Sequence, residues 1–145
     1  MREDTINLLK ECNSGITMGI SSINNVLPYV KNPHIKEALI TSKERHAKLG
    51  EEAHKALADY NESRNPPHKM AKFMADMKIK AKMAMTMDSI DKQIASSMTD
   101  GCNMGIKSIH RYLNKYNAAD SLSKDIAKEI IDTEEKLRVS MCQFL

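Results

Sequence analysis

The sequence predicts an all-α protein: a four-helix bundle of two antiparallel hairpins, with a long helical crossover between the second and third helices. Helix-forming Ala, Leu, Lys, Glu and Met dominate, whereas aromatic residues make up 4% and Trp is absent. Apolar residues recur every three or four positions in four stretches. The connections within each pair of stretches are short, and the connection between the pairs is long.

A chain of 145 residues is long enough for one ordinary domain and too short for two comfortable ones. We therefore expect a single domain over residues 1–145. Its first hairpin is predicted at about residues 4–61, the crossover at about 62–87 and the second hairpin at about 88–145.

The first predicted helix runs from about Asp4 to Leu27, and Pro28 and Pro33 stop it. Its buried stripe is predicted to comprise Ile6, Leu9, Asn13, Ile16, Ile20, Ile23 and Leu27. Gly15 and Gly19 lower helix propensity inside this segment. We interpret them as positions where a neighbouring helix approaches closely.

The second predicted helix opens at Asn32 and Pro33, a good N-cap followed by a residue suited to the first helical position. It ends between Asn61 and Pro67. Its buried stripe is predicted to comprise Ile35, Leu39, Ser42, His46, Leu49, Ala53, Leu57 and Tyr60. The short loop before it predicts an antiparallel hairpin with the first helix.

The third predicted helix starts after an N-cap at Asp88 and ends near Tyr116, and a short turn over residues 117–121 leads into the fourth helix. The third helix is predicted to bury Met98, Cys102, Ile106, Ile109, Leu113 and Tyr116. The fourth is predicted to bury Leu122, Ile126, Ile130, Thr133, Leu137, Met141 and Phe144.

The two predicted hairpins share short sequence matches. Residues 12–16 read CNSGI and residues 102–106 read CNMGI, and residues 40–44 fall opposite residues 131–135 at almost the same offset. Because both helices of each hairpin take part, we interpret the matches as an internal duplication.

This layout resembles the ferritin-like superfamily, and more narrowly the small bacterial ferritin-like proteins of unknown function. At the sequence level the resemblance is carried by the stretches DGCNMGIKSI and AKEIIDTEEKL. It implies that metal-binding members use one Glu from each of the first and third helices and a Glu-x-x-His motif from each of the second and fourth. These ligands hold two iron or manganese ions.

Most of those ligand positions carry other residues here. Four positions depart from the family pattern: Asn13, Lys43, Asn103 and Leu137. Only His46 and Glu134 remain, and two ligands do not hold a pair of ions. The sequence therefore predicts that the di-metal site is lost, with no catalytic residue, no metal ligand and no cofactor.

A polar layer is predicted at the former metal position. In this hypothesis Lys43 takes the place of the metal charge and pairs with Glu134, and the remaining members are hydrogen-bonded, because unpaired buried charges are costly. The layer comprises Asn13, Ser42, Lys43, His46, Asn103, Thr133 and Glu134. The alternative is that Lys43 extends to solvent along the edge of its helix.

The net charge, the cysteines and the apolar runs of the chain indicate its expected partners and location. The net charge is +3, with acidic and basic residues interleaved, so nucleic acid is not an expected partner. The three cysteines have no paired spacing, which favours a reducing compartment. The sequence has no apolar run typical of a signal peptide or transmembrane segment, and we expect a cytoplasmic protein.

The segment at residues 69–87 is unusually rich in Met and Lys. Its methionines are Met70, Met74, Met77, Met83, Met85 and Met87. The favoured interpretation is a crossover helix whose methionines cover the bundle, because Met fills irregular gaps. A Cu(I) site fits poorly, since Met83, Met85 and Met87 point to different sides of a helix. A docking face for a protein partner or an anionic membrane is the third interpretation.

Two function classes follow. The first is a non-catalytic structural or interaction module, a homo-oligomer and most simply a homodimer. The alternative is a ferritin-like oxidoreductase or metal-storage protein with an atypical di-iron or di-manganese site built from His46, Glu134 and Asp100. The ligand substitutions favour the first.

Overall fold

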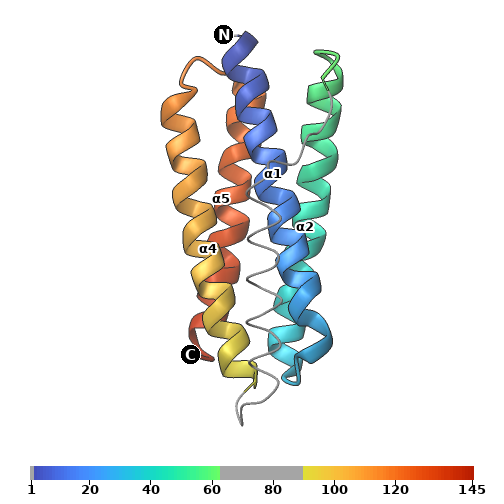
Figure 1. Cartoon of the computed structure of the whole chain (residues 1–145), viewed down its shortest axis with the longest axis vertical. Coiled ribbons are helices and arrows are strands. Elements are labelled where there is room, and N and C mark those ends of the chain that lie inside the picture. The colour runs from blue at the N-terminus through green and yellow to red at the C-terminus, as the bar shows by residue number, and fades with distance from the viewer. Residues whose placement is uncertain (1, 63–89) are drawn as a thin grey trace.

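The computed structural model describes residues 2–62 and 90–145, which form four α helices and one short 3₁₀ turn with no strand among them. The helices lie side by side as a bundle (Figure 1). Their bounds are α1 Arg2–Val26, η1 Leu27–Tyr29, α2 Pro33–Ala58, α4 Ile90–Lys115 and α5 Ser121–Cys142. The all-α prediction is confirmed. The largest helix contacts are between α4 and α5 and between α1 and α2, followed by α2 with α5.

Short polar side chains define where α2 and α5 begin. The Asn32 side chain accepts hydrogen bonds from the backbone N–H groups of His34 at 2.8 Å and Ile35 at 3.4 Å, so the predicted N-cap is confirmed. Asp120 caps α5 in the same way by accepting from the Ser123 N–H at 2.8 Å.

Two carboxylates connect distant parts of the chain at opposite ends of the bundle. Asp91, in the first turn of α4, accepts hydrogen bonds from the backbone N–H groups of Lys31 at 2.8 Å and Asn32 at 3.0 Å. Asp4, at the start of α1, accepts from the Ala118 N–H at 3.0 Å. The α1–α2 loop is thereby fixed to the start of α4, and the α4–α5 turn to the start of α1.

The apolar core consists of two clusters of buried residues. The first comprises Leu8, Leu9, Cys12, Ile16, Leu49, Ala53, Ala56, Leu57, Ile109, Ala119, Ile126, Ala127 and Ile130. The second comprises Ile23, Val26, Ile35, Leu39, Ile94, Ala95, Met98, Cys102, Leu137 and Met141. Every helix contributes to both clusters, so each helix crosses from one to the other partway along its length.

The predicted stripes place most of these residues correctly, with one clear error. Leu122 is 56% exposed, whereas the sequence predicted it in the core. Ser123 is buried instead, and its hydroxyl donates to the carbonyl of the N-cap residue Asp120 at 3.0 Å. The cap fixes the rotation of the first turn of α5, and this rotation turns Leu122 outward.

Several predictions fall on residues outside the described ranges. They are the predicted crossover at about residues 62–87, of which only residue 62 is described, the N-cap at Asp88 and the Met- and Lys-rich segment at residues 69–87. Among the helices of the described ranges, none is both long enough and apolar enough to cross a bilayer.

Candidate functional site

A buried polar layer separates the two core clusters. It comprises Ser42 and His46 on α2 with Thr133 and Glu134 on α5, all of which are buried. On α2 these residues lie between Leu39 of the second cluster and Leu49 of the first. Four of the seven residues predicted for a central polar layer are therefore brought together, and they come from two facing helices.

His46 and Glu134 form the centre of the layer. The Nε2 atom of His46 lies 2.7 Å from Oε1 of Glu134, and the ring is fully buried. On the other side of the ring, Nδ1 lies 2.7 Å from the backbone carbonyl oxygen of Ser42. A carbonyl oxygen can only accept, so Nδ1 carries a hydrogen and donates it. The pair is therefore either an imidazolium facing a carboxylate or a neutral imidazole facing a carboxylic acid.

The electrostatic surroundings favour the imidazolium. Burial is the strongest single influence on the pKa of His46 and lowers it, because a charged ring loses its hydration. The hydrogen bond to Glu134, its negative charge and the Ser42 carbonyl all raise that pKa, against a small opposing effect of Arg45. Together they outweigh burial, so the pKa of His46 lies above its ordinary value of 6.5.

Cys102 on α4 is a third partner in the layer. Burial of its thiol, together with the negative charge of nearby Glu134, raises the thiol pKa far above its usual range. A thiol held protonated in this way is a poor nucleophile, since the thiolate is the reactive form. The hydrogen-bonded pair of His46 and Glu134 thus lies near a buried thiol that is not an activated nucleophile.

Two glycines let the helices pack against this pair. A Cβ atom on Gly19 of α1 would lie 2.8 Å from Nε2 of His46 and 3.4 Å from Oε1 of Glu134. A Cβ atom on Gly105 of α4 would lie 3.5 Å from the carboxyl carbon of Glu134. Gly19 therefore leaves room for the imidazole, which agrees with its interpretation as a position of close helix approach.

The residues of the layer do not fit the di-metal centre that the resemblance implies. With Nδ1 donating to the Ser42 carbonyl, only Nε2 of His46 could act as a ligand, and it faces the single carboxylate of Glu134, which is too few ligands for two ions. In the described part of the chain no three His, Cys, Asp or Glu residues are arranged so that they could hold a metal ion. The alternative site of His46, Glu134 and Asp100 is not assembled, because Asp100 is exposed on α4.

Three other predicted members of the layer lie elsewhere. Asn103 is exposed, since α4 directs Cys102 into the core and the next residue is rotated by roughly 100°. Asn13 is buried but lies six residues before Gly19, about 9 Å along α1. Its amide oxygen has no hydrogen-bond partner among the described residues.

The predicted pair of Lys43 with Glu134 is not present. Lys43 is half-buried at the edge of α2 and makes no ion pair within residues 2–62 and 90–145, whereas Glu134 is paired with His46. A buried Lys ammonium would need acceptors for all of its N–H donors, because unpaired buried charges are costly. The His46 ring has only two nitrogens to satisfy, and both have partners, the Ser42 carbonyl and Glu134. The cationic partner of Glu134 is thus the histidine of the predicted layer and not its lysine.

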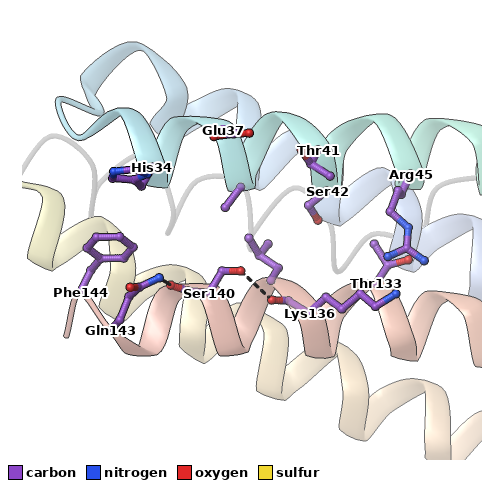
Figure 2. A pocket seen from close by; sticks show the side chains of 12 residues that line it. His34, Glu37, Thr41, Ser42, Arg45, Thr133, Lys136, Ser140, Gln143 and Phe144 are labelled. Carbon is purple, nitrogen blue, oxygen red and sulfur yellow. Dashed lines mark hydrogen bonds between the residues drawn. The ribbon is translucent and has the colours of Figure 1, made fainter.

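A groove of about 360 Å³ runs between α2 and α5 beside the layer. Figure 2 shows Arg45, Lys136 and Thr133 towards one end and His34 and Phe144 at the other. Ser42 and Thr133 line the groove and also belong to the polar layer. The layer therefore closes the inner side of this groove.

Arg45 bridges the rim of the groove near the layer. Its guanidinium lies 3.2 Å from an oxygen of Asp132 and 3.8 Å from one of Glu129, both on α5. Lys136 contacts the same Asp132 oxygen at 3.0 Å. These pairs are exposed to solvent and contribute little to stability.

Sequence reasoning missed Cys102 and Gly105 as parts of the layer. Gly105 could have been found from the sequence, since a glycine inside a helix often marks the close approach of a neighbouring helix. Nothing in the sequence indicated that Cys102 would lie beside the polar layer, because a buried Cys behaves as an ordinary small apolar residue.

Comparison with protein-family models, with curated proteins and with solved structures finds no match to this chain.

Proposed function

We propose that this chain is a ferritin-like bundle that binds no di-metal centre and serves as a non-catalytic structural or interaction module. The observation that carries the proposal is the engagement of both His46 ring nitrogens, at 2.7 Å each, by Ser42 and Glu134. A hydrogen-bonded ion pair thereby supplies the positive charge that a metal ion would otherwise bring to Glu134.

The lack of an activated group around this pair also supports a non-catalytic role. The Cys102 thiol is held protonated beside Glu134, and His46 is buried with both nitrogens engaged. A general base or nucleophile must be able to reach a substrate proton or atom. Neither side chain offers a free nitrogen or a thiolate for this purpose.

The ferritin-like arrangement of two antiparallel hairpins is part of the proposal. In its support, α1 packs most on α2 and α4 most on α5. The bonds of Asp91 to the α1–α2 loop and of Asp4 to the α4–α5 turn are those expected if α1 and α4 run in opposite directions. A crossover between α2 and α4 completes the proposed topology.

Metal analysis by plasma mass spectrometry tests the proposed function. Untagged protein from medium supplemented with iron and manganese is expected to contain well under one equivalent of either metal. A His46→Gln variant, prepared in parallel, is expected to give the same background. About two equivalents in the wild type that are lost in the variant would overturn the proposal in favour of a metal-binding oxidoreductase or storage protein.

We also propose that the module is a homodimer. Support comes from large apolar side chains that are exposed on α4, on α5 and at the C-terminus, namely Met104, Leu122, Val139 and Leu145. Sedimentation velocity over a range of concentrations is expected to give twice the mass of the chain. A monomer mass at all concentrations would contradict the dimer.

A further inference from the structure

The His46–Glu134 pair spans the two helices that form the walls of the groove. His46 belongs to α2 and Glu134 to α5, and the contact between them is buried. Ser42 and Thr133, which line the groove at this level, bond within their own helices: the Thr133 hydroxyl donates to the Glu129 carbonyl at 2.8 Å. Neither hydroxyl ties α2 to α5.

The other polar contacts between these helices are weak. Arg45 reaches Asp132 and Glu129 across the rim of the groove, but all three side chains are substantially exposed. Exposed ion pairs of this kind contribute little to stability. Separating a buried pair is costly, because each charge is then left in the core without its partner. Between the two apolar clusters, the strongest polar contact that joins α2 to α5 is therefore the His46–Glu134 pair.

We propose that the His46–Glu134 pair is a built-in closure that holds α2 and α5 together, and that its release opens the groove into the core as far as Cys102. Each of the four helices places a different group next to the pair. On α1 the residue against the pair is Gly19, which carries no charge, and on α2 Arg45 opposes a positive charge on His46. On α4 the buried Cys102 thiol lies near Glu134, and on α5 Glu135 and Arg138 pair with each other.

Cys102 is the reporter of this opening. It is 1% exposed and lies close enough to Glu134 for the charge of that carboxylate to raise its pKa, so it is expected to become accessible when the pair separates. Cys12 is the internal reference, because it is fully buried in the first core cluster and burial raises its pKa to about 12. Cys142 is exposed and is removed as Cys142→Ser.

Two glycine substitutions on α1 form a matched pair for the test. Gly19→Ala places a methyl group 2.8 Å from Nε2 of His46 and so displaces the ring, while no titratable side chain is removed or added. Gly15→Ala adds the same methyl group one helical turn earlier, where it meets only the Ile109 side chain at an ordinary 3.6 Å. Both changes raise helix propensity equally.

The experiment measures the rate at which a thiol reagent labels each cysteine, resolved by mass spectrometry of peptides. Gly19→Ala is expected to speed Cys102 labelling about tenfold relative to Cys12, as local opening would. Gly15→Ala is expected to leave both rates unchanged within about twofold. Equal acceleration of Cys102 and Cys12 in Gly19→Ala, or none, would overturn the proposal.

A second variant covers a failure of Gly19→Ala to fold. His46→Gln leaves the backbone and the Glu134 charge in place, so the pKa of Cys102 stays high and its labelling still reports access. The same selective acceleration of Cys102 is expected. Labelling at the wild-type ratio in a folded His46→Gln protein would refute the closure.

Discussion

Two nitrogen atoms of His46 determine what the polar layer can bind. Nδ1 donates to the Ser42 carbonyl and Nε2 faces Glu134, so under the proposed function the ring acts as the counter-charge of the carboxylate. A single residue thus separates a metal-binding interpretation of this bundle from an ion-pair interpretation.

Removing the charge of Glu134 is expected to be costly. Glu134→Gln keeps the side-chain shape but leaves His46 without a charged partner in the core, and breaking a buried pair in this way costs about 3–5 kcal/mol. Urea unfolding followed by circular dichroism measures the change in unfolding free energy.

Lys43→Ala is the matched control on the facing helix. Because Lys43 is only half-buried and has no ion pair in the described ranges, its loss is expected to change stability by less than about 0.5 kcal/mol. A cost equal to that of Glu134→Gln would show that the lysine holds the buried charge after all.

The raised pKa of His46 predicts how stability depends on pH. A group whose pKa is higher in the folded state stabilises the fold fully below its unfolded value, here about 6.5, and that contribution is lost as pH rises through the folded pKa. Each unit of difference contributes about 1.4 kcal/mol. Unfolding free energy should therefore fall on the alkaline side in wild type, and this fall should be absent in His46→Gln. A parallel fall in both proteins would assign the effect to other groups.

At the scale of the elements, periodicity and capping predicted the helices well. The start of α2 follows directly from Asn32-Pro33, because cap chemistry is local, and the predicted turn over residues 117–121 leads to the start of α5 at Ser121. Rotation about the helix axis was harder to predict. Periodicity placed Leu122 inward, and the family pattern placed Asn103 in the polar layer. Both are exposed, because a shift of one residue turns a side chain by roughly 100°.

The N-cap of α2 allows a direct test at this scale. Asn32→Ala removes the side chain that accepts from two backbone N–H groups and is expected to cost about 1 kcal/mol. Asn24→Ala, on the exposed side of α1, removes an amide with no capping role and should change stability by less than about 0.5 kcal/mol. Thermal unfolding of both variants measures the difference. An equal effect of the two substitutions would contradict the capping role.

For the whole molecule, the central question is whether the two core clusters unfold together. All four helices contribute to both clusters, so neither cluster can separate without breaking helices that the other uses. We expect one cooperative transition, as is usual for a single domain of this size. Amide signals of Leu9 and Ile130 in the first cluster and of Ile94 and Leu137 in the second should lose intensity at the same temperature. Separate midpoints would indicate two independent units.

The candidate site was predictable only in part. The burial of Ser42, His46 and Thr133 followed from spacing, since they belong to the predicted inward stripes of two helices, whereas Glu134 was placed beside them by the family pattern. Which cation pairs with Glu134 depended on side-chain length and on the space above Gly19, and neither is encoded in spacing. Cys102 entered the layer through three-dimensional packing alone.

The most direct test of the account is the protonation state of the His46 ring, measured by long-range ¹H–¹⁵N correlation on histidine-labelled protein at neutral pH, with His46→Gln for assignment. The account predicts that both ring nitrogens are protonated, and that added iron or manganese leaves their signals unchanged. A ring with one unprotonated nitrogen, or one whose signals broaden or vanish with an equivalent of metal, would contradict the ion pair at the centre of the bundle.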